Sequence, residues 1–400
     1  MNLYLQFGHG MMGLSKELLS AGLARGVILS PRDLTEVQLQ RVAEDARLAN
    51  ADCLFDPQCY LHDSSHSRLL SYQYWKHFRD CATSSLFSET GMKQVLTELF
   101  DLNGTIGLSR VILPGMLGET ITDNWLALLK LTVEEALRIS SNQKVIATIA
   151  LSETAIRSEE QIESVIDATA QFAVDGYYVV AEAPSSSYLV GDPVWLANLL
   201  ILVAGLKLQG KIVVVGYTSH QHLALAATNV DAIASGSWLN VRAFHRGKFY
   251  QSGADDVSRR SVWYYSPSAL SEYPLPFLDI ARRHGVLDLM APLDGMPSQY
   301  ASPLFAGPQP STIRWGEGLA FRHYLSCLDW QCRQVSAASF ANGLTLQESL
   351  LSTAESTNAV LRENGVFGRS RDFADYTDVN RSALVALDRA LGGRLRRIVW

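Results

Sequence analysis

Two carboxylates in this 400-residue chain each end a short apolar run. Asp56 ends Cys-Leu-Phe-Asp and precedes a proline, and Glu182 ends Val-Val-Ala-Glu. A carboxyl group that is partly removed from water can serve as a nucleophile or as a general acid or base. The structural alternatives are that Asp56 caps the next segment and that Glu182 forms an internal ion pair. We predict Asp56 as the catalytic group and Glu182 as its partner.

Polar residues and glycines follow the other apolar runs as well. His9 lies in Phe-Gly-His-Gly, where glycines let a ligand approach the backbone closely, although a lone histidine is often structural. Ser219 and His220 begin a helix whose free N–H groups suit a phosphate or carboxylate, and ordinary capping by Ser219 fits equally well. The predicted substrate-binding residues are His9, Arg32, Asp33, Gln58, Gly216, Tyr217, Ser219, His220, Ser235, Ser237 and Trp238.

Eight apolar runs would position these residues. They are almost continuously Val, Ile and Leu, which is typical of strands covered on both faces. Most are followed by a helical pattern, and this alternation within about 250 residues predicts a (β/α)8 TIM barrel, whose ligands bind at the C-terminal strand ends. An open doubly wound sheet is the alternative, disfavoured because no Gly-x-Gly-x-x-Gly follows an early strand. The runs are 3–7, 27–30, 53–56, 110–113, 144–150, 176–181, 211–216 and 231–235.

The pattern divides the chain into a barrel, 1–250, and a second region, 251–400. The second region begins with an irregular connection to about 315 and continues as helices, so the fold class is a TIM barrel with an α-helical C-terminal extension. Residues at about 57–108 are too many for a simple strand-to-helix connection. They are polar and aromatic, which predicts an insertion over the barrel mouth; a lid packed on its own aromatics is the alternative.

Composition excludes some classes of protein. The 48% hydrophobic content suits a large buried core, and no apolar run reaches the ~20 residues that span a bilayer. The N-terminus lacks a basic leader, so we expect a cytoplasmic protein with reduced cysteines and no membrane partner. Cys327 and Cys332 lack a suitable histidine pair, and we predict neither a metal nor a cofactor.

The net charge of −6 argues against indiscriminate binding to polyanions, but a local basic face can exist within an acidic total. Arg242, Arg246 and Lys248 form such a cluster in the sequence, and we predict that they contact nucleic acid. A solvated surface is the alternative.

The order of these motifs resembles the tRNA-guanine transglycosylase superfamily, which includes relatives that insert 7-deazaguanines into DNA. Leu54-Phe-Asp-Pro-Gln-Cys-Tyr60 is similar to the family's Asp-Ser-Gly-Gly-Phe-Gln segment, and 175–182 is similar to its Asp-Gly-Tyr…Gly-Glu strand. The run 213–219 with Asn229-Val-Asp231 resembles its Met-Gly-Val-Gly…Gly-Val-Asp run, and 322–325 with 359–368 resemble its later helices. The resemblance implies a barrel that exchanges a base by carboxylate attack on the sugar C1′.

Two departures from the family matter. Ala234 stands where the family has its nucleophilic Asp, and the family's zinc motif is absent. Three hypotheses follow. The chain exchanges or removes a purine or deazapurine base in tRNA or DNA through Asp56 and Glu182. It is instead a catalytically silent nucleic-acid-binding subunit of a base-modification or defence system. Or it is a barrel enzyme for a small phosphorylated or nucleoside substrate. A homodimer or a heteromeric complex is compatible with each.

Overall fold

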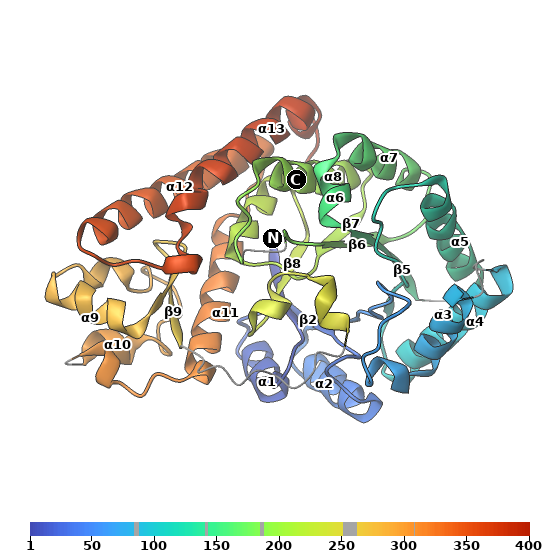
Figure 1. The fold of residues 1–400 in the computed structure, drawn as a ribbon, viewed down its shortest axis with the longest axis horizontal. Coiled ribbons are helices and arrows are strands. Elements are labelled where there is room, and N and C mark those ends of the chain that lie inside the picture. Colours follow the sequence, from blue (N-terminus) through green and yellow to red (C-terminus); the bar gives the residue numbers. More distant parts are fainter. Residues whose placement is uncertain (84–87, 141–142, 185–187, 251–261, 308) are drawn as a thin grey trace.

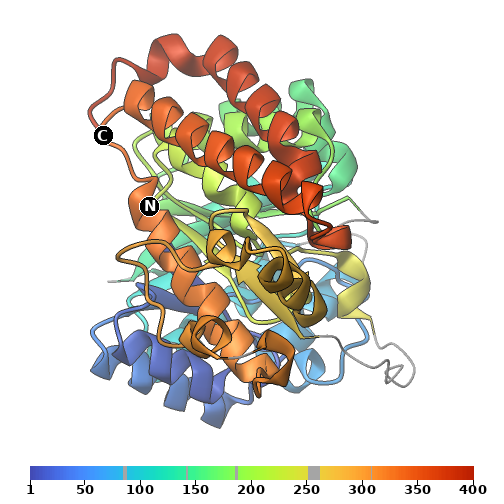
Figure 2. The ribbon, with the colours of Figure 1, turned by 90° about the vertical axis from the view of Figure 1, so that its left-hand side faces the viewer.

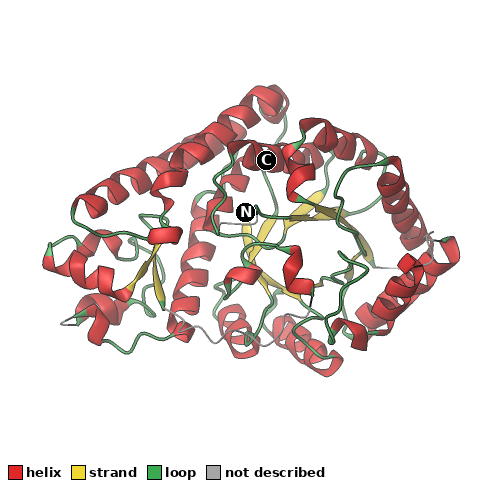
Figure 3. Ribbon diagram, viewed as in Figure 1, coloured by secondary structure: helices red, strands yellow, loops and turns green. Residues whose placement is uncertain are grey.

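The structure, a computed structural model, describes residues 1–83, 88–140, 143–184, 188–250, 262–307 and 309–400. Eight parallel strands form a nearly closed barrel in the order β3-β2-β1-β8-β7-β6-β5-β4, surrounded by helices (Figures 1 and 3). The predicted TIM barrel is confirmed. The strands are β1 (Asn2–Gln6), β2 (Gly26–Leu29), β3 (Asp52–Phe55), β4 (Arg110–Ile112), β5 (Lys144–Leu151), β6 (Gly176–Ala181), β7 (Ile212–Val215) and β8 (Ala232–Ser235).

The helices around the barrel begin where the sequence supplies capping side chains. Thr35 forms a capping box with Gln38 at the start of α2, and Asp192 accepts hydrogen bonds from two backbone N–H groups at the start of α8. Such caps satisfy N–H groups that have no partner within the helix. The helices are α1 (Met12–Ser20), α2 (Glu36–Leu48), α5 (Asp123–Ile139), α6 (Glu153–Arg157), α7 (Glu159–Thr169), α8 (Pro193–Leu208) and the 3-10 helix η2 (His220–Thr228).

The long connection between β3 and β4 carries two helices, α3 (Gln73–Thr83) and α4 (Glu89–Thr105). Its aromatic residues point into the protein and fasten the loop that follows β3. The hydroxyl of Tyr74 donates a hydrogen bond to the Pro57 carbonyl at 2.9 Å, and Tyr72 donates to the Leu34 carbonyl at 2.6 Å. The first bond holds the residues directly after β3 in place, and the second joins the connection to the segment after β2.

The C-terminal region packs on one side of the barrel (Figures 1 and 2). Its described residues form a hairpin, five α-helices and several short 3-10 helices, and a second small core forms around Tyr264, Tyr273 and Leu278. Helix α8 is apolar on all sides because α13 covers its outer surface. The elements are β9 (Trp263–Ser266), β10 (Ser271–Pro274), α9 (Leu275–Arg283), α10 (Ser302–Ala306), α11 (Glu317–Gln334), α12 (Phe340–Glu363) and α13 (Thr377–Leu395).

The helices expected after about residue 315 are present as α11, α12 and α13. The predicted irregular connection instead contains the antiparallel β9–β10 pair, and its first part, 251–261, lies outside the described residues. Within the described residues, none of the helices is long and apolar enough to cross a membrane.

Candidate active site at the barrel mouth

Asp56 lies directly after β3 and is completely buried in the barrel mouth. Its carboxylate accepts hydrogen bonds from the Tyr60 hydroxyl at 2.7 and 2.8 Å and from the backbone N–H of Gln58 at 2.9 Å. The hydroxyls of Tyr217 and Tyr178 lie 3.2 and 3.3 Å away. Burial raises the pKa of Asp56 to about 6, although these hydrogen bonds act in the opposite direction. Such a pKa allows a carboxyl group to gain and lose a proton near neutral pH.

Gln58 connects Asp56 to the neighbouring strand end. Its side-chain amide donates to the Tyr217 hydroxyl at 2.9 Å and to Ser30 Oγ at 3.0 Å, and its Oε1 accepts from the Arg32 backbone N–H at 3.2 Å. Gln58 and Tyr217 both adopt left-handed backbone conformations, with φ of 54° and 56°. Such conformations cost roughly 1–3 kcal/mol each in a residue other than glycine, and they cluster at functional sites.

Gly216 makes room for this network. A Cβ atom at this position would lie 2.2 Å from the hydroxyl oxygen of Tyr178, so any other residue would displace that tyrosine. The predicted residues Asp56, Gln58, Gly216 and Tyr217 therefore meet in one cluster, as the strand-end argument requires.

A segment that follows β8 closes the mouth above Asp56. We call residues 239–250 the mouth cover; Figure 1 shows it in yellow across the end of the barrel. The ring of Phe244 packs edge-on against Tyr60 and Tyr217, with centroids 5.0 and 5.4 Å away. Phe249 packs against Tyr60 at 5.5 Å. Asp56 is thus shielded from solvent by aromatic rings.

Glu182, which directly follows β6, belongs to a different group of side chains. Both of its carboxylate oxygens accept hydrogen bonds from Arg246 of the mouth cover, which is also ion-paired with Glu119. Burial by itself would raise the pKa of Glu182, but the bonds and charge of Arg246 outweigh it and hold the pKa below its usual value. No hydrogen bond joins Glu182 to Asp56 among the described residues. The internal ion pair that the sequence allowed is present.

An open groove of about 360 Å³ lies beside this ion pair. It is lined by Glu153, Glu182, His245 and Arg246, together with Thr154, Ala183 and Gly247. The groove combines acidic and basic groups at the C-terminal ends of β5 and β6. It is the solvent-facing part of the mouth.

Arg242 is placed away from solvent, although the sequence predicts it as a nucleic-acid contact. Its guanidinium lies 3.4 Å from the centre of the Tyr324 ring and 3.2 Å from the Glu272 carboxylate. Arg371 approaches the same carboxylate at 2.9 Å. This largely buried Arg–Glu–Arg group joins the barrel to the C-terminal region. The Arg242 guanidinium is already bound to Glu272 and packed on Tyr324 within it.

Several predicted substrate-binding residues lie near this group and not near Asp56. His220 is buried among the rings of Tyr188, Tyr265, Tyr324 and Phe373, and burial lowers its pKa to about 3. Ser219, Ser235 and Ser237 are buried as well, and the Ser237 carbonyl accepts a hydrogen bond from Arg242.

His9 and Trp238 lie together at the rim of the mouth. His9 is exposed, and its carbonyl accepts a hydrogen bond from the Trp238 indole at 3.2 Å. Trp238 packs against Phe321 of α11 with centroids 4.8 Å apart. The pair therefore joins the β1 loop to the C-terminal region.

Sequence reasoning found Tyr217 but missed the other aromatic members of the site. Tyr60 and Tyr178 donate to Asp56, and Phe244 covers it, yet all three resemble core residues in the sequence. The spacing of Tyr60 from Asp56, four residues away in one loop, was the available signal for the first. Glu272, the partner of Arg242, follows a connection that gave no indication of contact with the barrel.

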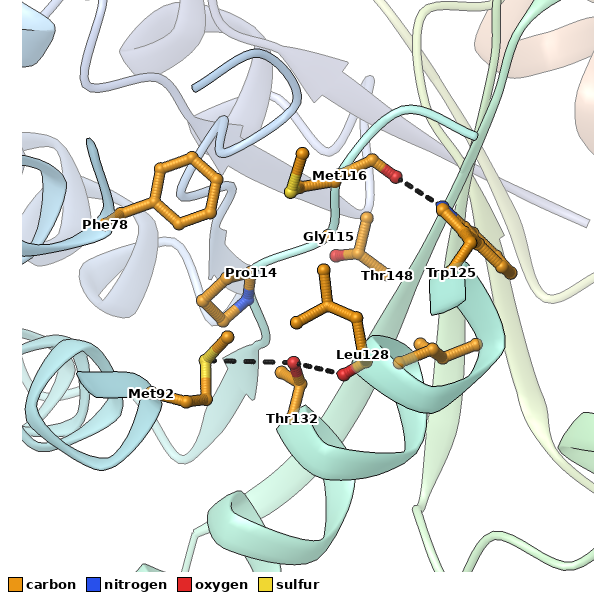
Figure 4. A pocket seen from close by; sticks show the side chains of 10 residues that line it. Phe78, Met92, Pro114, Gly115, Met116, Trp125, Leu128, Thr132 and Thr148 are labelled. Carbon is orange, nitrogen blue, oxygen red and sulfur yellow. Dashed lines mark hydrogen bonds between the residues drawn. The ribbon is translucent and has the colours of Figure 1, made fainter. Parts of the chain in front are cut away.

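A second, apolar cavity of about 20 Å³ lies outside the barrel wall (Figure 4). Met92 of α4, Pro114 and Met116 after β4, and Trp125 and Leu128 of α5 line it with five other residues. It contains no titratable side chain, so it offers no group for acid–base chemistry. In the described part of the chain, no three potential metal ligands come together.

Comparisons with known proteins add no family. No family model and no curated protein matches the chain. A solved thiamine phosphate pyrophosphorylase from Pyrococcus furiosus is 14% identical over 59% of this chain and 85% of that chain, with a TM-score of 0.32. An enolase protein from Sargasso Sea environmental sequencing is 14% identical over 58% and 53%, with a TM-score of 0.31. D-psicose 3-epimerase is 8% identical over 54% and 84%, with a TM-score of 0.28. Likenesses this distant say nothing about activity, and the transglycosylase resemblance stays a prediction.

Proposed function

We propose that this chain is a barrel enzyme that acts on the glycosidic bond of a nucleoside unit, exchanging or removing a purine-type base in tRNA or DNA. The observation that carries the proposal is the environment of Asp56. A single carboxyl group with a pKa of about 6 ends a barrel strand and is surrounded by three tyrosine hydroxyls. The C-terminal strand ends are where TIM-barrel enzymes hold their catalytic groups.

The resemblance supplies the substrate class, and it agrees with the site in one respect. The segment 54–60, which is similar to the family's Asp-Ser-Gly-Gly-Phe-Gln segment, contributes Asp56, Gln58 and Tyr60 to the same cluster. In this proposal the ionised Asp56 attacks C1′, and the base leaves with the electrons of the C1′–N bond and takes a proton from solvent. The incoming base, in exchange, or water, in removal, then attacks C1′, loses a proton and releases the Asp56 carboxylate. The tyrosine hydroxyls orient the carboxyl group.

The closed mouth sets a condition on the mechanism. Phe244 and Phe249 must move before a sugar can reach Asp56, and return of the cover would exclude water from the reaction. Arg246 holds the cover to Glu182, so we assign Glu182 to the control of this movement. This assignment replaces the chemical role predicted from the sequence.

The test is base exchange with the full chain. The protein is incubated with radiolabelled guanine and either tRNA or duplex DNA, and label in the polymer is counted. We expect Asp56→Asn to lower the exchange rate by about 10²–10⁴-fold, the usual contribution of an acid–base group. Asp329→Asn, which changes another buried carboxyl, serves as the matched control and should retain the rate.

Equal rates in the wild type and in Asp56→Asn would overturn the assignment. An absence of exchange, together with salt-dependent polymer binding, would favour the silent binding subunit instead.

A further inference from the structure

Three basic residues from three separate segments lie near one another beside the Asp56 cluster. Arg32 follows β2, His66 lies in the loop after β3, and Lys248 belongs to the mouth cover. The Arg32 guanidinium lies over the Phe249 ring at 5.1 Å and donates to the Lys248 carbonyl at 3.4 Å. Ser64, next to His66 in the loop, donates to the Phe249 carbonyl, so the loop and the cover are held together here.

Acidic groups do not balance this cluster. Among the described residues, Asp33 is the sole carboxylate ion-paired with Arg32, and the Nε–Oδ2 distance of 3.6 Å is too long for a hydrogen bond. Asp33 instead accepts a hydrogen bond from Ser30 at 2.8 Å. Neither Lys248 nor His66 has an ion-pair partner in the described part of the chain. The cluster therefore holds more basic groups than acidic ones, and Arg32 is only 6% exposed.

The buried atoms of the cluster also indicate that negative charge is lacking. The Nδ1 atom of His66 is buried and has no hydrogen-bond partner within the described ranges. Burial, with a smaller contribution from the charge of Arg32, lowers the pKa of Lys248 to about 7. The same two causes lower the pKa of His66. The charged forms of Lys248 and His66 are therefore disfavoured in the free protein, and a bound anion would favour them.

We propose that Arg32, Lys248 and His66 bind a phosphate group of the substrate. The proposal rests on the proposed function and makes it more specific, because it requires a phosphorylated nucleoside unit. Arginine offers two parallel N–H donors to a phosphate, and Lys248 adds a point charge on the movable cover.

The position of this subsite fits the chemistry at Asp56. The Arg32 backbone N–H donates to the Gln58 side chain, and the Gln58 backbone N–H donates to Asp56. Gln58 thus connects the phosphate subsite to the carboxyl group. A phosphate held by Arg32 and Lys248 would also attach the cover to the substrate, which would couple substrate binding to closure of the mouth.

The experiment compares two ligands that differ by one phosphate. Guanosine and guanosine 5′-monophosphate are titrated calorimetrically into the full chain, and a short DNA duplex forms a third arm. We expect wild type to bind the monophosphate, the duplex, or both, with at least a tenfold loss of affinity in Lys248→Met. Lys76→Met removes an exposed lysine from α3 and should cause no loss.

The two polymer-free ligands and the duplex distinguish the source of the phosphate. A preference for the monophosphate over guanosine that Lys248→Met removes identifies a free nucleotide, and a loss confined to the duplex identifies the nucleic-acid backbone. Unchanged affinities in Lys248→Met for both phosphorylated ligands would overturn the proposal. Arg32→Met should behave as Lys248→Met does, and Lys248→Met decides the outcome if Arg32→Met fails to fold.

The two proposals fail in different ways. Phosphate-dependent binding without guanine exchange would reject the transglycosylase activity and keep the subsite. Exchange that is insensitive to Lys248→Met, with unchanged affinities, would reject the subsite alone.

Discussion

Replacing Asp56 by Asn should change how the stability of this protein depends on pH. The folded protein holds the pKa of Asp56 at about 6, against 3.8 for the free side chain. Between about pH 4 and 6 the folded state therefore binds more protons than the unfolded state, and stability falls as the pH rises. The penalty is absent below about pH 4 and complete above about pH 6. Two pKa units correspond to roughly 3 kcal/mol.

Asn has no charge to desolvate. Its amide oxygen can accept the bonds made to one carboxylate oxygen, and its NH2 group can donate to the tyrosine hydroxyls that bond to the other. We expect the stability of Asp56→Asn relative to wild type to improve by about 3 kcal/mol between pH 4 and pH 7. For a 400-residue chain with an unfolding entropy of about 2.1 cal/mol/K per residue, this is a change of roughly 4 °C in the Tm difference. Scanning fluorimetry at both pH values measures it.

The comparison must be a difference between two proteins. Burial lowers the pKa of His220 to about 3 and that of His222 and His323 to about 4. These histidines make the folded state more stable as the pH rises, which is opposite in sign to the effect of Asp56 and falls in the same range. The histidines are present in both proteins, so subtracting the wild-type Tm from that of Asp56→Asn at each pH removes their contribution. Asp294→Asn, at an exposed site, should leave the difference flat. If the Tm difference between Asp56→Asn and wild type is also the same at both pH values, the carboxyl group of Asp56 is not desolvated.

Three further changes test neighbouring contacts. Gly216→Ala places a methyl group 2.2 Å from the Tyr178 hydroxyl and should cost about 1–3 kcal/mol of stability, while Gly13→Ala, with open space around it, should cost nothing; equal Tm values would contradict the crowding. Tyr60→Phe removes a bond that lowers the Asp56 pKa, so the corresponding limb of the pH–rate profile should move to higher pH; a limb that stays in place would separate Asp56 from the rate. Glu272→Gln leaves the buried guanidinium of Arg242 and the partly buried one of Arg371 without their carboxylate and should cost about 3–5 kcal/mol in denaturant unfolding, against no more than about 1 kcal/mol for the exposed Glu348→Gln; similar costs would refute the buried ion-pair argument.

The barrel could be predicted from the sequence because most positions of its strands are buried on both faces and are apolar. The positions of Asp56 and Gln58 followed from the same reasoning, since a barrel places the residues after its strands at one end. The β9–β10 hairpin was missed because Trp263–Ser266 and Ser271–Pro274 are aromatic and polar, with no continuous apolar run. Their burial depends on the C-terminal helices, which no local pattern reveals.

The roles of the arginines could not be predicted for a related reason. Arg242 and Arg246 are similar in the sequence, four residues apart, but Arg242 is buried against Glu272 and Arg246 reaches Glu182 and Glu119. Which carboxylate each arginine meets depends on how the chain returns over the barrel after β8. Sequence spacing contains no information on that path.

The two carboxylates of the mouth differ in the chemistry that they can perform. Arg246 keeps the pKa of Glu182 below its usual value, so Glu182 stays ionised at neutral pH and cannot donate a proton there. Asp56, with a pKa of about 6, can exist in either form. Because environments that separate two pKa values also separate the roles of the two groups, we propose Asp56, and not Glu182, for proton transfer. The lasting charge of Glu182 is suited to holding Arg246, and through it the mouth cover, until a substrate arrives.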